Sequence, residues 1–438
     1  MIRLTSLPLV ALLFVGTACD SLTDITSVGV VQPSSVASSQ GAVAQYAGAV
    51  KHFVTASLNA VEFSGLFADE WITTDSPGNS VGGYIDARRP GTVAFQTGGL
   101  LFTGYSQALI ALRFASNGLQ QFAPTRRANI GQVLAYQGYL ELFLAEHFCS
   151  GVPFSTIDYD GTVRYGAATD VVATYNRAIA HFDSAATFAT DSARVLDLAR
   201  VGKARALLGL GRYPAAAAAV NGVPTSFVHH LDISGSIAGQ TNQMYNSILL
   251  SFRGVPAASE GGGIDFVGAR DPRVPTRGPI TGLDGLGTRI YEYSNYNSLA
   301  APVLIANGAE ARLIEAEAAL AGNNNDSAPT GNGWLGILNA LRSGSAFAGQ
   351  LPPLADPGSY PARVDLLFRE RAFWTFLTGH RMGDLRRLVR QYNRQADAVF
   401  PHGPYRDGVP YGSEVNLIPP PIGEGPNTLY TGCIDRRA

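Results

Sequence analysis

The chain has 438 residues, of which 46% are hydrophobic and 15% charged, with 34 acidic and 32 basic side chains and a net charge of -2. This length fits two or three domains of about 150 residues each, or one large repeat array. The balanced charge argues against a nucleic-acid-binding protein, which would carry a basic excess, and against an acidic disordered chain. We therefore expect a folded protein with a sizeable core and no nucleic-acid partner.

The N-terminus has the features of a bacterial secretory signal. The apolar run over residues 4–15 is shorter than the roughly 20 residues that span a bilayer, and it follows a positively charged start. The small residues Gly16 and Ala18 precede Cys19, a pattern that resembles the lipobox of bacterial lipoproteins, whose cysteine is lipidated. We predict a signal peptide over 1–18 and lipidation of Cys19, with ordinary secretion and an unmodified cysteine as the alternative.

The segment after the signal reads as a tether, because residues 19–38 are rich in Ser, Val and Thr and show no helical period. No other segment is apolar enough to span a bilayer, so we expect a protein that is anchored and not spanning. The remaining two cysteines, Cys149 and Cys433, either pair as a disulfide in an oxidising compartment or stay as two buried thiols.

The rest of the chain, 39–438, is predicted to be a single, mostly all-α domain. Apolar residues recur at three- and four-residue steps, which indicates amphipathic helices. The clearest such stretches are 125–148, 170–188, 198–208, 303–320 and 366–377. Strand-like alternation is scarce, and the intervening insertions at 71–98, 222–300 and 399–438 are expected to be irregular.

One helix pair carries a more specific signal. Gly211, Tyr213 and Ala216 follow the spacing of a tetratricopeptide hairpin, in which the glycine closes the turn, the aromatic ring fills the gap and the alanine permits close crossing. The pattern predicts antiparallel, tetratricopeptide-like helix pairs with long loop insertions. In such arrays, binding residues lie on loops that project from a rigid stack.

The sequence offers few signs of catalysis or metal binding. None of the seven histidines falls in a His-Glu-x-x-His arrangement, so a zincin-type metal site is not expected. Glu310 and Glu317 are separated by two turns of one predicted helix, roughly 10 Å, which is compatible with the carboxylate pair of a glycoside hydrolase. Such pairs more often form packing ion pairs, and we expect no cofactor.

Several segments, in chain order, resemble the SusD/RagB family of outer-membrane nutrient-binding lipoproteins. The segments are Ala135–Phe148 with Gly151-Val152-Pro153-Phe154, Arg270-Asp271-Pro272-Arg273, Ala309–Ala318, Glu370-Arg371 with Gly379-His380-Arg381 and Asp384–Arg387, and Leu417–Ile422. The helical spacing of Arg381 and Asp384 favours a side-chain pair between them, and His380 is expected to bond a backbone carbonyl. We interpret this last signature as a lock that holds the final helix pair.

The resemblance implies a SusD-like superhelix without catalysis, anchored by lipid in the outer membrane and facing the cell surface. It also implies a partner, a SusC-like TonB-dependent transporter, to which the protein would deliver an oligosaccharide or a peptide. Two other functions stay open: a secreted α/α-type glycan hydrolase, and a tetratricopeptide scaffold of the envelope that binds other proteins.

No residue-level ligand motif comes with the resemblance, so candidates are taken from the aromatic-bearing insertions of this chain. Sugar rings pack on aromatic faces, while amide and charged groups read hydroxyls. The first insertion offers Trp71, Asp75, Asn79 and Tyr84, with Trp71 the strongest candidate, and the second offers Arg289, Tyr291, Tyr293, Asn295 and Tyr296. The alternative for each aromatic residue is packing against the helix stack.

Overall fold

The computed structural model describes residues 36–75, 80–89, 94–237, 239–323, 325–344, 346–419 and 426–437, with only the backbone described over 94–100. The signal peptide, Cys19, Asn79 and the tether up to residue 35 lie outside these ranges. Within them, no helix combines the length and hydropathy that crossing a membrane requires.

Helices form most of the body, as the sequence predicts. The first half contains α2 (Ser39–Phe67), α3 (Val81–Asp86), α4 (Ala94–Phe122), α5 (Arg127–His147), α6 (Val171–Phe188), α7 (Ala193–Gly209) and α8 (Tyr213–Val220). The second half contains α9 (Gln243–Ser251), α10 (Gly308–Gly322), α11 (Trp334–Gly344), α12 (Tyr360–Trp374) and α13 (Arg381–Tyr392). The 3-10 turns η3 (Ala189–Asp191) and η4 (Ala396–Ala398) complete the set.

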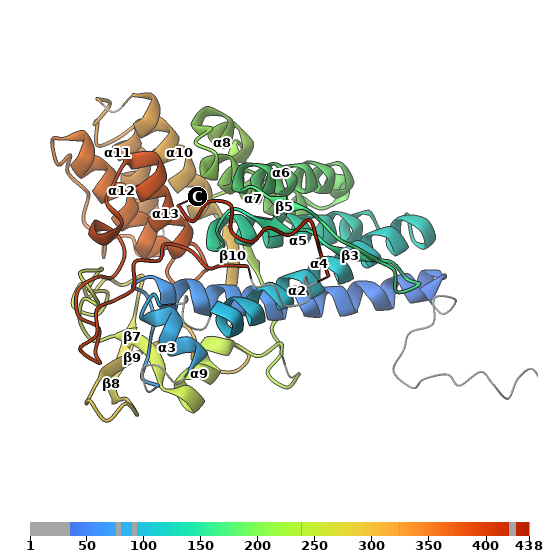
Figure 1. Ribbon diagram of the computed structural model, residues 1–438. Helices are drawn as coiled ribbons and strands as arrows, with labels where there is room; N and C mark the ends of the chain where they lie inside the picture. Colours follow the sequence, from blue (N-terminus) through green and yellow to red (C-terminus); the bar gives the residue numbers. More distant parts are fainter. Residues whose placement is uncertain are drawn as a thin grey trace, which may run out of the picture.

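Successive helices pack in pairs, α4 on α5, α5 on α6, α6 on α7 and α7 on α8, so the predicted tetratricopeptide-like stack is confirmed (Figure 1). Gly211 closes the α7–α8 turn with a φ of +68°, a conformation that favours glycine. A Cβ atom at Gly202 would lie 2.4 Å from the Phe182 ring, so the absence of a side chain there lets α6 and α7 cross closely.

The long helix α2 joins the two sides of the molecule. It has 29 residues, or roughly 44 Å at 1.5 Å per residue, and it contacts α4, α5, α9 and α13. Phe53 on α2 stacks on Tyr136 of α5 with ring centroids 3.7 Å apart. Figure 1 shows α3, α9 and the main sheet on one side of α2, with α6, α7 and α8 on the other.

The described strands are short, and half of the ten lie in the predicted irregular insertions. They are β1 (Ile72–Thr73), β2 (Val152–Pro153), β3 (Thr156–Ile157), β4 (Val163–Arg164), β5 (Ala168–Thr169), β6 (Val228–His230), β7 (Arg253–Pro256), β8 (Thr276–Thr281), β9 (Arg289–Tyr293) and β10 (Leu304–Asn307). The main sheet has the order β1-β7-β9-β8, and the remaining strands form the two-stranded pairs β10-β6, β2-β5 and β3-β4.

Two expectations are corrected by these strands. The insertion 222–300 is not wholly irregular, because it contains α9 and most of the main sheet. Leu304, expected on a helix face, lies on β10 and pairs with His230 of β6, and α10 begins only at Gly308. Strands of two to six residues are too short for alternation to stand out in the sequence.

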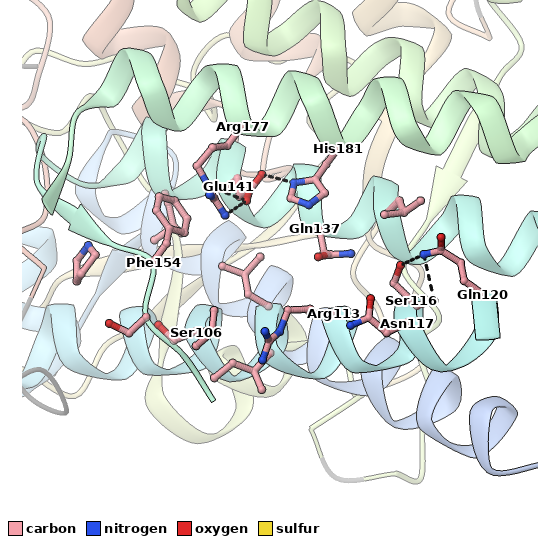
Figure 2. Close-up of a pocket in the computed structure, with 17 residues that line it drawn as sticks. Ser106, Arg113, Ser116, Asn117, Gln120, Gln137, Glu141, Phe154, Arg177 and His181 are labelled. Atoms are coloured by element: carbon pink, nitrogen blue, oxygen red, sulfur yellow. Dashed lines mark hydrogen bonds and ion pairs between the residues drawn. The ribbon is translucent and has the colours of Figure 1, made fainter. Parts of the chain in front are cut away.

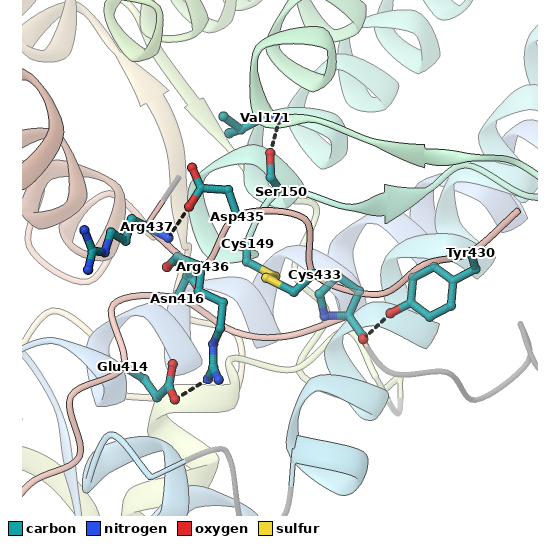
Figure 3. The surroundings of a disulfide bond; sticks show 11 residues. Cys149, Ser150, Val171, Glu414, Asn416, Tyr430, Cys433, Asp435, Arg436 and Arg437 are labelled. Carbon is teal, nitrogen blue, oxygen red and sulfur yellow. Dashed lines mark hydrogen bonds and ion pairs between the residues drawn. A yellow bond between two sulfur atoms is a disulfide. The ribbon is translucent and has the colours of Figure 1, made fainter.

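A disulfide between Cys149 and Cys433 fixes the C-terminal segment to the end of α5 (Figure 3). The two cysteines are 284 positions apart in the sequence, and their Cα atoms are 5.9 Å apart. Beside the bridge, Leu417 donates its N–H to the His147 carbonyl at 2.7 Å and accepts from the Cys149 N–H at 2.8 Å. Of the two alternatives for these cysteines, the paired form is therefore the one observed.

Buried arginine–carboxylate pairs hold α12 and α13 to the rest of the body. Arg371 on α12 binds Asp384 on α13 through two hydrogen bonds of 2.9 Å. Arg387 binds Glu317 of α10 at 2.6 and 2.9 Å and also contacts Asp384 at 3.1 Å. All four side chains are buried, and breaking such a pair by removing one partner typically costs 3–5 kcal/mol. The interpretation of this signature as a lock is confirmed.

The partners inside the lock differ from the expected ones. Arg381 does not pair with Asp384, since its guanidinium binds Asp69 at 2.6 and 2.7 Å, just beyond the end of α2. His380 contacts the Thr378 carbonyl at 3.2 Å, as predicted, and also Glu310 at 2.9 Å. Burial alone would raise the pKa of Asp384, but Arg371 and Arg387 hold it well below its usual range.

His147, at the end of α5, is a buried histidine whose charge matters for stability. Its ring stacks on Phe143, and its Nδ1 lies 3.1 Å from the Tyr105 hydroxyl. Burial, with Arg205 and Arg386 nearby, lowers the pKa of His147 to about 3. The ring is therefore neutral in the folded protein at neutral pH.

We predict that the free energy of unfolding falls as the pH drops from about 6.5, the pKa of an unfolded histidine, towards 3. In this window the unfolded chain binds a proton at His147 that the folded chain does not, so stability rises with pH and levels off above it. His147→Gln should remove about 1–2 kcal/mol of the loss between pH 6.5 and 5, measured by urea unfolding. His52→Gln, at an exposed position of α2, is the control, and an equal slope in both variants would contradict the assignment.

Candidate ligand-binding cleft

The site that best matches the predicted ligand residues is a cleft of about 500 Å³. It lies where β9 ends, where α12 ends and where β6 and β10 run side by side. Its lining residues are Val228, His230, Arg273, Tyr293, Asn295, Tyr296, Pro302, Leu304, Asn307, Ala309, Phe347, Phe373, Trp374, Phe376 and Thr378. We call it the aromatic cleft, because six of these residues are aromatic rings of Phe, Tyr or Trp.

One wall of the aromatic cleft comes from the turn after β9. The Tyr296 N–H donates to the Tyr293 carbonyl at 3.0 Å, and the two rings meet edge to face with centroids 5.0 Å apart. The Asn295 amide donates to the Tyr293 hydroxyl at 2.9 Å, while Asn295 itself is exposed. The Tyr296 hydroxyl bonds the Leu377 carbonyl at 2.8 Å, which ties the turn to the segment after α12. This wall therefore presents the exposed Asn295 amide next to two tyrosine rings that hydrogen bonds hold in place.

The facing wall is formed by the end of α12. Trp374 is half-buried, and its ring lies 6.0 Å from Phe347. The Arg273 guanidinium lies 5.0 Å from the Trp374 ring centre and 5.1 Å from that of Phe373. Such cation–π contacts hold the rings in place, so the wall offers a fixed aromatic surface to a ligand.

The protonation states of the ionisable groups in the aromatic cleft are set by burial and by hydrogen bonds to neighbouring residues. Burial lowers the pKa of Arg273, but hydrogen bonds to Asp271 and Glu370 more than offset it, so the net pKa is raised and the side chain stays cationic. Burial raises the pKa of Tyr293 to about 12, although the Asn295 hydrogen bond opposes this. Burial also lowers the pKa of His230. At neutral pH the cleft thus holds a neutral phenol and a neutral imidazole.

The described lining of the aromatic cleft contains no Asp or Glu. A glycoside hydrolase needs two carboxyl groups that flank the scissile bond. Glu310 and Glu317 are buried, and they are engaged with His380 and with Arg387 respectively. The cleft is therefore equipped for packing and hydrogen bonding, and it offers no acid–base pair.

The second predicted group of ligand residues is partly brought together by the structure. Tyr293, Asn295 and Tyr296 line the aromatic cleft. Arg289 is exposed and Tyr291 half-buried further along β9, and neither lines the cleft.

The first predicted group lies elsewhere, and the expectation for Trp71 is corrected. Trp71 is a core residue with 1% of its surface exposed, so its ring cannot stack on a ligand at the surface. Asp75 forms an ion pair with Arg253 at 3.2 Å, and Tyr84 is half-buried on α3. Asn79 is outside the described residues. None of the three described residues lines the aromatic cleft.

Trp374, Phe347 and His230 line the aromatic cleft but were not predicted from the sequence. Trp374 follows Phe373 within a helix whose apolar period indicates core packing, so periodicity alone does not single it out. One usable signal was present, the dense aromatic run of Phe373, Trp374 and Phe376 at a predicted helix end. Helix ends and the loops after them carry binding residues disproportionately.

No family model matches the sequence, and no curated protein resembles it closely enough to match. The structure, in contrast, is similar to solved structures. A SusD superfamily protein from Bacteroides vulgatus matches with a TM-score of 0.60 at 14% identity, over 89% of this chain and 98% of that one. A SusD homolog from Bacteroides thetaiotaomicron matches with a TM-score of 0.61 at 12% identity, over 90% and 96%.

The protein NanU of Bacteroides fragilis is also similar, with a TM-score of 0.56 at 13% identity, over 90% of this chain and 96% of that one. Nearly the whole length of these structures is matched, so the similarity covers the complete fold. The expected SusD-like architecture is therefore confirmed.

Proposed function

We propose that this SusD-fold protein belongs to the SusD/RagB family and binds an oligomeric nutrient, a glycan or a peptide, without catalysis. In this proposal it is an outer-membrane lipoprotein, anchored through Cys19 and facing the cell surface. It hands the nutrient to a SusC-like TonB-dependent transporter. The observation that carries the proposal is the aromatic cleft, found in a protein with this fold.

The aromatic cleft suits an oligomer for physical reasons. The C–H faces of sugar rings and the apolar side chains of peptides pack on aromatic surfaces, which removes apolar area from water. The exposed Asn295 amide lies at the edge, where it can read a hydroxyl or a peptide group. The volume of about 500 Å³ falls in the range of small-molecule sites, about 300–1,000 Å³, so a few units of a longer chain fit.

The hydrolase alternative is disfavoured by the same geometry, because Glu310 and Glu317 do not line the cleft and are engaged in ion pairs with His380 and Arg387. The scaffold alternative predicts a smooth groove without accessible aromatic rings. Trp374 and Phe347 are both partly exposed at the cleft, which favours a ligand of defined chemistry over a general protein surface.

The ligand role is tested by removing one aromatic ring from the cleft, that of Trp374. Trp374→Ala should weaken binding of the best glycan or peptide from an array by about tenfold or more, because both the stacking and the buried area are lost. Tyr360→Ala, which removes an exposed ring at the other end of α12, is the matched control and should bind as the wild type does. Equal affinities for both variants would place the ligand elsewhere.

The anchor is tested separately. Cys19→Ala should shift the protein from the membrane fraction towards the soluble fraction, because the acyl chains proposed to anchor it cannot be attached. The measurement is the distribution of the protein between membrane and soluble fractions. Membrane retention at the wild-type level would contradict lipidation at Cys19.

The delivery role requires a partner. Affinity purification of the lipidated protein from its native membrane should recover a TonB-dependent barrel, and the barrel should still be recovered with the Trp374→Ala variant, in which ligand binding is weakened. Purification without any barrel would count against delivery while leaving the ligand role intact.

A further inference from the structure

A second cavity, of about 280 Å³, lies between α4, α5 and α6, on the helical side of the molecule. We call it the helical pocket. It shares no lining residue with the aromatic cleft. Figure 2 shows polar side chains entering it from all three helices, with Arg177 and His181 reaching from α6 towards Glu141 of α5. Its walls are formed by these three helices and by the segment 153–156 around β2 and β3.

The centre of the helical pocket is the buried carboxylate of Glu141. Arg177 binds one oxygen through Nε at 3.2 Å and Nη2 at 3.1 Å, and His181 Nδ1 lies 2.6 Å from the other. Because Nδ1 must carry a proton to donate to the carboxylate, Nε2 of a neutral imidazole is left as an acceptor. Nothing described in the chain bonds that Nε2, which belongs to a half-buried side chain lining the pocket.

Gln137, one turn before Glu141 on α5, adds a second acceptor. The residue is 6% exposed, and its Nε2 lies 3.5 Å from the Val133 carbonyl. No described residue donates to its Oε1, and Figure 2 shows the amide at the pocket between α5 and α4. The oxygen is not among the fully enclosed acceptors that lack a partner, so it can accept an O–H or N–H group from a ligand in the pocket.

The opposite wall combines donors, acceptors and an apolar surface. Gln120 donates to the Ser116 hydroxyl at 2.9 Å, and the exposed Asn117 amide stands at the rim. The Arg177 guanidinium lies 4.1 Å above the Phe154 ring. Apolar side chains complete the lining, namely Leu109, Ile110, Leu134, Leu144 and Pro153.

We propose that the helical pocket binds one hydroxyl-rich sugar unit, at a site separate from the aromatic cleft. A sugar ring carries hydroxyls that both donate and accept hydrogen bonds, and it also has an apolar C–H face. The hydroxyls match the acceptors of Gln137 and His181 and the Asn117 amide, and the C–H face matches the apolar side chains of the lining. The volume, just below the usual range of ligand sites, limits the ligand to about one unit. The proposal stands whether or not the aromatic cleft binds a glycan.

The arrangement is a binding site and not a hydrolytic one. Glu141 and His181 resemble the supporting pair of a nucleophilic triad, yet none of the described hydroxyl groups forms a hydrogen bond with His181. Nucleophilic catalysis needs the nucleophile within hydrogen-bond reach of its base. The pair instead fixes the imidazole so that Nε2 faces a ligand.

The test uses saturation-transfer NMR on the mature chain carrying Cys19→Ala, with glucose, galactose, mannose and N-acetylglucosamine as separate probes. At least one sugar should bind the wild type. Gln137→Leu, which keeps the shape but removes the acceptor, should raise its dissociation constant at least tenfold. Asn117→Ala, at an exposed position that cannot disturb the core, should raise it about threefold.

Gln107→Leu, at an exposed position of α4 outside the pocket, is the matched control and should bind like the wild type. Sugar signals that survive Gln137→Leu but vanish in Trp374→Ala would assign the sugar to the aromatic cleft and overturn the proposal. Signals from free amino acids or dipeptides, with none from the sugars, would overturn it too, as would no signal from any sugar.

Discussion

The fold depends on a set of buried arginine–carboxylate pairs around α12 and α13. Glu370 is bound by Arg273 and Arg342 at 2.8 and 2.6 Å, as Asp384 is by Arg371 and Arg387. These groups lose their hydration on folding, so each carboxylate needs its arginines to offset that cost. Because the partners come from distant parts of the sequence, the pairs can form only when the helix stack, α10 and the segment before β8 are all in place.

The same pairs position the aromatic cleft. Arg273 is held by Glu370 on one side, and its other face lies against Phe373 and Trp374. A ring fixed in this way loses little further freedom when a ligand stacks on it, which reduces the entropic cost of binding. The shape of the lock and the character of the cleft are thus two consequences of one packing arrangement, and neither requires a catalytic group.

The sequence predicts well what is decided locally. Helical periodicity located α5 and α6 almost to the residue, because an amphipathic face repeats over many turns. Burial of a single aromatic residue is decided by contacts from elsewhere. Trp71 follows the end of a helix, as a loop residue would, but α2 and the segment around Leu377 enclose it. Tyr293 and Tyr296 end at a cleft because a strand end and a helix end happen to converge there, which no local pattern encodes.

The two cavities differ in a way that follows from the elements around them. The aromatic cleft forms where a strand end and a helix end meet, and in the proposed function it accepts part of a long chain. The helical pocket lies between α4, α5 and α6. Side chains four residues apart on one helix, such as Gln137 and Glu141 on α5, point into it together. Helices cannot move apart there without breaking the α4–α5–α6 packing, so the pocket admits only what its polar floor can satisfy. Because the two cavities have no lining residue in common, the energetic effects of substitutions in one should add to those of substitutions in the other.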